Sequence, residues 1–240
     1  MLTGKCPALT GLLAVTLLVS TAAADLMRPV TPGDNTLQEL LDSLVVAGPG
    51  FDAVNDQQNQ AYFASSASGL SLSCLAADPA VPVDPIEFVL GIYAIDNPDI
   101  RAVLFDASSQ GGDMSVVSFR ADASVSINFG PAVANLGSRF GFFLTADQQT
   151  WFSDDTLNPN NQAAVLIYQG DPANTLQMPG LRPGRMTPYD FIIAFESGDN
   201  QSFADMVIVA ESISLVPEPA TVMFLAAGLA CVRRLGGRRI

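Results

Sequence analysis

Short apolar stretches with a two-residue repeat recur along this chain, and Gly, Pro, Asn or Asp separates most of them. The clearest repeat places Ala123, Val125, Ile127 and Phe129 on one side and polar residues on the other. Because successive side chains of a β-strand point to opposite faces, this pattern predicts a strand with one buried face. Many such stretches at near-regular spacing predict an all-β fold, a single β-sandwich of jelly-roll-like form.

One helix and a series of further strands complete the expected fold. The other predicted strands are 61–66, 70–75, 87–95, 102–105, 114–120, 140–145, 163–168, 189–195 and 206–215. A short N-terminal helix is expected at 36–44, where Leu37, Leu40, Leu41 and Leu44 fall on one face. No repeat or internal linker is visible, so we expect one compact domain over residues 25–215.

Charged residues are unevenly distributed along the chain. Residues 25–216 hold six arginines against 23 acids, a net charge of −17. Nucleic acid is therefore excluded as an expected partner, because phosphate binding needs a basic surface. Cations or neutral glycans suit an acidic protein better.

Two missing residue types restrict the chemistry. The chain has no histidine, and no lysine follows Lys5. These absences exclude catalytic nucleophiles that depend on histidine, zinc or copper sites with His ligands, and catalysis through a lysine Schiff base. We expect a protein that is not an enzyme, with no catalytic residues.

The N-terminal residues 1–24 have the pattern of a secretory signal. Lys5 precedes an apolar run at 8–19, and the small residues Ala22 and Ala24 stand directly before Asp25. This order predicts export and removal of the segment by signal peptidase between Ala24 and Asp25. Cys74 is then the one cysteine left between the two terminal segments, and its apolar surroundings at 70–77 predict a buried side chain.

The C-terminal residues 216–240 combine three features. Pro217-Glu218-Pro219 is followed by an apolar stretch at 222–232 and then by Arg233-Arg234. This order resembles the PEP-CTERM sorting signal of exosortase substrates. The resemblance implies transient inner-membrane association through a hydrophobic C-terminal helix, processing by exosortase, and a location at the cell surface or outside the cell. A permanent membrane anchor is the alternative.

The stretch 189–209 contains two apolar segments separated by an acidic loop that ends in Phe203-Ala204-Asp205. Together with Trp151-Phe152-Ser153-Asp154 and Gly91-Ile92-Tyr93, it resembles the DUF4114 family over about residues 86–215. The resemblance implies Ca²⁺ as a cofactor, held by Glu196, Asp199 and Asp205. Oxygen ligands suit this ion. An ordinary hairpin with Phe203 in the core is the alternative.

Three functions remain open at this level. The first is a structural or adhesive protein of a biofilm or exopolysaccharide matrix. The second is a calcium-dependent glycan-binding module. The third is a glycoside hydrolase that uses carboxylates alone, drawn from Asp154, Asp155, Glu196 and Asp205, which would need two acids about 5–9 Å apart across a cleft.

Overall fold

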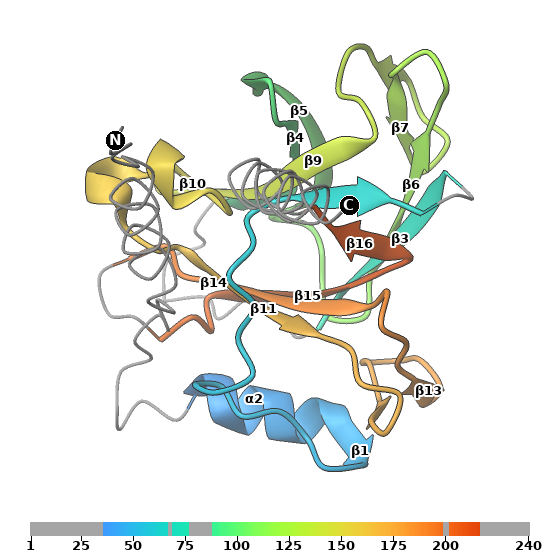
Figure 1. The fold of residues 1–240 in the computed structure, drawn as a ribbon, viewed down its shortest axis with the longest axis vertical. Coiled ribbons are helices and arrows are strands. Elements are labelled where there is room, and N and C mark those ends of the chain that lie inside the picture. The colour runs from blue at the N-terminus through green and yellow to red at the C-terminus, as the bar shows by residue number, and fades with distance from the viewer. Residues whose placement is uncertain (1–35, 67–68, 77–87, 199–201, 217–240) are drawn as a thin grey trace, which may run out of the picture.

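The computed structural model describes residues 36–66, 69–76, 88–198 and 202–216, which form three antiparallel sheets and one α-helix (Figure 1). The seven-stranded sheet has the order β11 (Val165–Gln169), β14 (Phe191–Phe195), β15 (Met206–Glu211), β3 (Leu70–Leu75), β6 (Met114–Phe119), β7 (Val125–Ile127) and β8 (Ala132–Val133). The six-stranded sheet has the order β16 (Ile213–Leu215), β2 (Phe63–Ser65), β9 (Arg139–Ala146), β4 (Phe88–Ala94) and β5 (Asn97–Asp106), with β10 (Gln149–Phe152) paired to β9. A small sheet joins β1 (Val45–Ala47), β12 (Thr175–Leu176) and β13 (Gly184–Arg185), and two 3₁₀ turns, η1 (Asp155–Leu157) and η2 (Pro159–Asn161), follow β10.

The main core lies between the seven-stranded and six-stranded sheets, to which both contribute inward-facing side chains. At its centre the Phe63 ring meets Phe142 and Phe191 edge-on, with centroids 5.1 Å and 5.5 Å apart. Aromatic pairs in this geometry add to the stabilisation that burial provides. The predicted all-β sandwich is confirmed.

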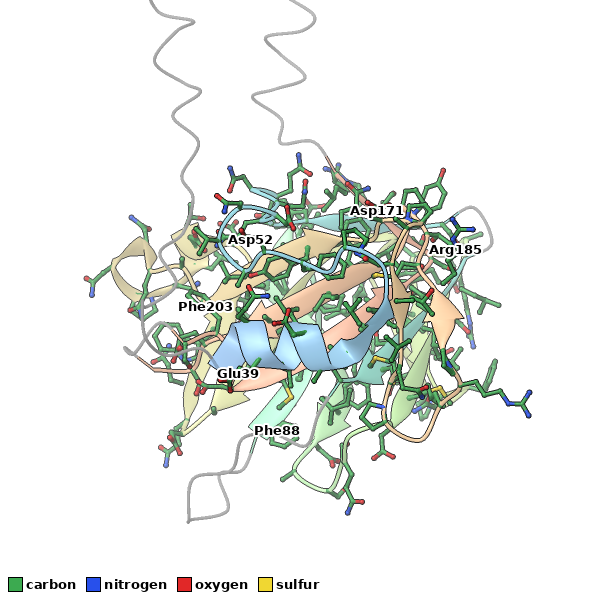
Figure 2. The ribbon with its side chains drawn as sticks, turned by 90° about the horizontal axis from the view of Figure 1, so that it is seen from below. Glu39, Asp52, Phe88, Asp171, Arg185 and Phe203 are labelled. Atoms are coloured by element: carbon green, nitrogen blue, oxygen red, sulfur yellow. The ribbon has the colours of Figure 1, made fainter. Side chains whose placement is uncertain are left out.

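A second core covers the outer face of the seven-stranded sheet. Here α2 (Thr36–Leu44) packs through Leu37, Leu41 and Leu44, which are at most 3 % exposed. The i, i+4, i+7 spacing of these leucines places them on one side of the helix. The predicted helix is confirmed with its predicted bounds. Figure 2 looks onto this side of the molecule and shows α2 crossing the strands.

The strands between the two cores are buried on both faces. Along β14 the side chains of Phe191, Ile193 and Phe195 enter the main core, whereas Ile192 and Ala194 enter the second. Both β11 and β15 divide their side chains in the same way. This explains why these strands have nearly continuous apolar sequences and lack a polar face.

The prediction of a strand over the 123–129 repeat is wrong at both ends. Only Val125–Ile127 forms β7, and Ala123 and Phe129 have φ angles of 63° and 60°. The chain turns sharply after Ile127, because the Gly130 amide donates to the Ile127 carbonyl at 2.8 Å. Phe129 is consequently 77 % exposed at the tip of a hairpin, not part of a buried face.

The single strand predicted at 206–215 is also divided. Ser212 has a φ of 61° and separates β15 from β16, which pair in different sheets. A left-handed residue turns the strand direction sharply, so the chain passes from one layer of the sandwich to the other. The strand predicted at 189–195 begins later, since Tyr189 lies in a turn and is 61 % exposed.

Candidate functional site

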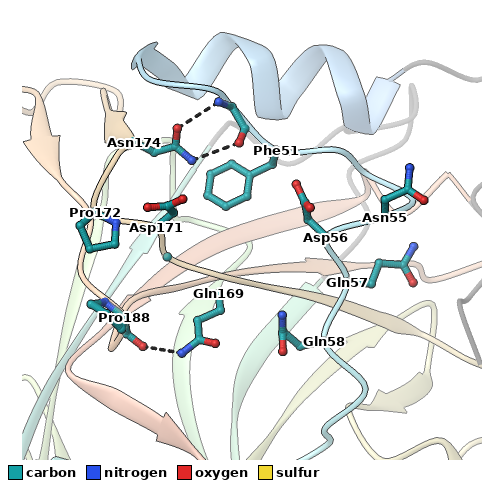
Figure 3. A pocket seen from close by; sticks show the side chains of 12 residues that line it. Phe51, Asn55, Asp56, Gln57, Gln58, Gln169, Asp171, Pro172, Asn174 and Pro188 are labelled. Carbon is teal, nitrogen blue, oxygen red and sulfur yellow. Dashed lines mark hydrogen bonds between the residues drawn. The ribbon is translucent and has the colours of Figure 1, made fainter. Parts of the chain in front are cut away.

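A polar pocket of about 480 Å³ opens beside α2, where two loops that are far apart in the sequence meet (Figure 3). One loop follows β1, and the other joins β11 to β12. The pocket is lined by Gly50, Phe51, Asn55, Asp56, Gln57, Gln58, Gln169, Gly170, Asp171, Pro172, Asn174 and Pro188. Its volume lies in the range of small-ligand sites.

The two loops are joined by one buried amide side chain. Asn174 is 1 % exposed; its Oδ1 accepts from the Gly50 amide at 3.0 Å and its Nδ2 donates to the Gly50 carbonyl at 3.1 Å. Gln38 of α2 holds the same loop from the side of the helix, donating to the Phe51 carbonyl and accepting from the Ala53 amide. The pocket walls are therefore fixed by side-chain bonds as well as by the strands.

The first loop is also attached to the edge of the seven-stranded sheet. Gln57 forms an isolated bridge with Tyr168, and the Gln58 amide donates to the Ile167 carbonyl at 2.8 Å. Beneath the loop, the Tyr168 hydroxyl donates to the Ala53 carbonyl at 2.8 Å. Burial raises the pKa of this hydroxyl, and the negative charges of Asp52 and Asp56 raise it further. It therefore serves as a neutral donor.

Three side chains of the pocket use one polar atom to hold the structure and leave another available. Asp56 Oδ2 accepts from the Asp52 amide, Asp171 Oδ1 accepts from the Ala173 amide, and Gln169 Nε2 donates to the Pro188 carbonyl, each at 2.8 Å. Within the described residues, Asp56 Oδ1, Asp171 Oδ2, Gln169 Oε1 and the Gln58 side-chain amide take part in no hydrogen bond. These groups are free to bind a ligand.

The predicted calcium ligands lie at the turn between β14 and β15. Glu196 is 1 % exposed, and its carboxylate accepts from the backbone amides of Gly198, Ser202 and Phe203 at 2.7–3.1 Å. Burial raises the pKa of Glu196, and the nearby Asp205 carboxylate acts in the same direction. The structure thus brings Glu196 and Asp205 close together.

Both carboxylates of this turn already bond to protein donors. Asp205 Oδ2 accepts from the amide and the hydroxyl of Ser197, both at 2.7 Å. Asp199 lies outside the described residues. No group of three or more His, Cys, Asp or Glu side chains suited to a metal is found among the residues that the structure describes. Calcium at Glu196, Asp199 and Asp205 stays a prediction. Phe203 is buried in the second core, as the hairpin alternative expects.

Asp154, one of the remaining acids named for a hydrolase, has structural partners of its own. Asp154 caps η1 by accepting from the Thr156 amide at 2.9 Å, and it also accepts from the Tyr62 hydroxyl. Trp151 lies in the main core. Two smaller pockets lie beside the β4–β5 turn and around Met186. Neither these two nor the pocket described above is lined by any of the four acids, Asp154, Asp155, Glu196 and Asp205. The hydrolase hypothesis gains no support.

The residues of the pocket do not stand out in the sequence. The available signal was a run of amide and acid side chains at 55–60, which stands between apolar segments. Nothing in the sequence indicates that this run faces residues 169–174, because that contact depends on the Asn174–Gly50 hydrogen bonds.

No family model and no curated protein sequence matches the chain. Among solved structures, it is similar to the lectin CV2L of Chromobacterium violaceum, solved in complex with alpha-methyl-fucoside. That match has 9 % identity and a TM-score of 0.29, covering 67 % of this chain and 100 % of the other. It is also similar to the C-terminal domain of the BC2L-C lectin of Burkholderia cenocepacia, with 10 % identity and a TM-score of 0.32, covering 67 % and 99 %. At these TM-scores neither similarity decides a function.

The terminal signals lie outside the described residues. This concerns Ala22, Ala24 and Asp25 at the expected cleavage site and Pro217, Glu218, Pro219, Arg233 and Arg234 in the expected sorting signal. Within the described part of the chain, no helix has the length and apolar character needed to span a membrane.

Proposed function

We propose that this chain is a non-catalytic glycan-binding protein of the cell surface or extracellular matrix, and that its pocket between residues 50–58 and 169–174 holds the sugar. The observation that carries the proposal is the set of unused polar atoms in this pocket, on Asp56, Gln58, Gln169 and Asp171. Sugar hydroxyls both donate and accept hydrogen bonds, so mixed amide and carboxylate groups suit them.

The surroundings of these groups also support a sugar ligand. Pro172 and Pro188 add apolar surface at the rim, and Phe51 lies between the polar side chains in Figure 3. The Phe51 ring packs edge-on against Tyr168 with centroids 6.2 Å apart, so this lining side chain is held in place by the second core. A preformed pocket loses less conformational entropy when a ligand binds.

Export supplies the context for such a role. The N-terminal signal pattern and the resemblance of the tail to a PEP-CTERM signal support delivery by signal peptidase and exosortase. Exopolysaccharide is then the expected partner, and an adhesive or structural role in a matrix follows from binding it. The DUF4114 resemblance of residues 86–215 fits an exported β domain.

Titration of the purified protein with neutral oligosaccharides tests the pocket. We expect Kd values of about 1 mM, as is usual for a small polar ligand in an open site. Gln58→Ala should weaken binding about fivefold, because it removes one hydrogen-bonding side chain. Gln110→Ala changes an exposed glutamine outside the pocket and should leave the affinity unchanged. Equal affinities of the wild type and Gln58→Ala, or no binding to any saccharide, would contradict the proposal.

A further inference from the structure

The charge of the pocket restricts which sugars suit it. Asp56 and Asp171 both line the pocket, one from each loop, and Figure 3 shows their carboxylates on either side of the Phe51 ring. No arginine is present among the twelve lining residues. Arg185 reaches the rim and donates to the Pro172 carbonyl, but neither aspartate forms an ion pair with any described residue. The two negative charges are therefore uncompensated within the described structure.

A ligand without charge would leave this imbalance in place. Its hydroxyls would replace water at the two carboxylates with other neutral donors, so this exchange of hydrogen bonds gains little net free energy. An acidic sugar would add repulsion between like charges. A positively charged group would instead form charge-assisted hydrogen bonds, which are the stronger kind.

The available acceptors of the pocket suit groups of this kind. Asp56 Oδ1, Asp171 Oδ2 and Gln169 Oε1 are among the side-chain oxygens of the pocket that accept no hydrogen bond from the described residues, and two of these three belong to carboxylates. An ammonium group has three donors and no acceptor. We propose that the preferred ligand is a glycan with free amino groups, that is, an unacetylated amino sugar. This inference rests on the proposed function of the same pocket.

Calorimetric titration of the full protein with three trisaccharides tests this preference. The probes are the trimer of glucosamine, the trimer of N-acetylglucosamine and a neutral glucose trimer, at pH 6 where the amine is protonated and at physiological salt. We expect the glucosamine trimer to bind about tenfold more tightly than the other two, as one or two partly exposed ion pairs allow.

Two matched double variants distinguish the effect of the negative charges in the pocket from the effect of the protein's overall negative charge. Asp56→Asn/Asp171→Asn should abolish the preference, while each asparagine keeps an oxygen for the Asp52 and Ala173 amides. Asp99→Asn/Asp147→Asn removes the same charge from exposed positions outside the pocket and should preserve it.

The other outcomes each overturn the inference in a distinguishable way. Equal binding of all three trimers would refute the amine preference but leave the glycan-binding proposal intact. An equal loss of preference in both double variants would indicate attraction to the overall negative charge. Failure to bind any of the three, or any other saccharide, would remove the proposed function itself.

Discussion

Cys74 shows how strongly the environment of one residue can control its chemistry. The side chain is 4 % exposed and lies in the second core. Burial raises the pKa of the thiol to about 11, and the charges of Glu211 and Asp113 contribute in the same direction. The reactive thiolate is therefore scarce at physiological pH.

We expect Cys74 to be inert toward a thiol reagent at pH 8 until the protein unfolds. A Cys6→Ser/Cys231→Ser variant leaves it as the single thiol. Its absorbance change with a chromogenic disulfide should be negligible in buffer and complete in denaturant. Rapid labelling of the folded protein would show that the residue is accessible.

Burial of single residues was largely predictable from the sequence. Cys74 is buried as expected, because it stands in an apolar run, and Phe203 is buried as the hairpin alternative expected. Phe129 was wrongly predicted to lie on the buried face of a strand, because the two-residue repeat continues in the sequence into what is a turn in the structure. The pair Asn128-Phe129 has positive φ angles, and a phenylalanine gives no sign of that conformation.

At the level of elements, this hairpin tip is the clearest source of local strain. Positive φ is unfavourable for a bulky side chain, and Phe129 gains little burial in compensation. Phe129→Gly should therefore raise the free energy of unfolding by about 1 kcal/mol, because glycine adopts this conformation without strain.

The matched variant Phe129→Ala removes the ring but keeps the strained backbone, so its stability should stay close to that of the wild type. Denaturant unfolding of the three proteins makes the comparison. A loss of stability in Phe129→Gly would show that the ring has a stabilising contact.

Long apolar elements were predictable, and short ones were not. The helix at 36–44 and the strand at 70–75 have their predicted bounds, since each has a full periodic pattern. The short strands of the structure were not predicted, namely β1, β8, β10, β12 and β13. Strands of two to four residues are too short for a repeat, and tertiary pairing alone defines them.

For the whole molecule, the sandwich was predictable but its third layer was not. The apolar runs of β11, β14 and β15 indicated burial, yet only the structure shows that α2 covers their outer face. The pocket depends on this layer, because Gln38 of α2 holds the loop at 51–53. A site assembled from two distant loops leaves no local motif in the sequence.

The expected route of export is tested on the intact protein. We expect the mature form to begin at Asp25 and to end within the Pro217-Glu218-Pro219 segment, because both terminal segments have the pattern of removable signals. Intact-mass spectrometry of the secreted protein measures both ends together. A full-length protein with its tail as the sole mature product would indicate a permanent anchor.

The turn at Ser212 has a mechanical consequence for a protein with the proposed adhesive role. Since β15 and β16 are consecutive but belong to opposite layers, a force that pulls on the end of β16 is transmitted to both sheets through one residue. Tension at this end would then reach the six-stranded sheet through the pairing of β16 with β2 and the seven-stranded sheet through Ser212 and β15.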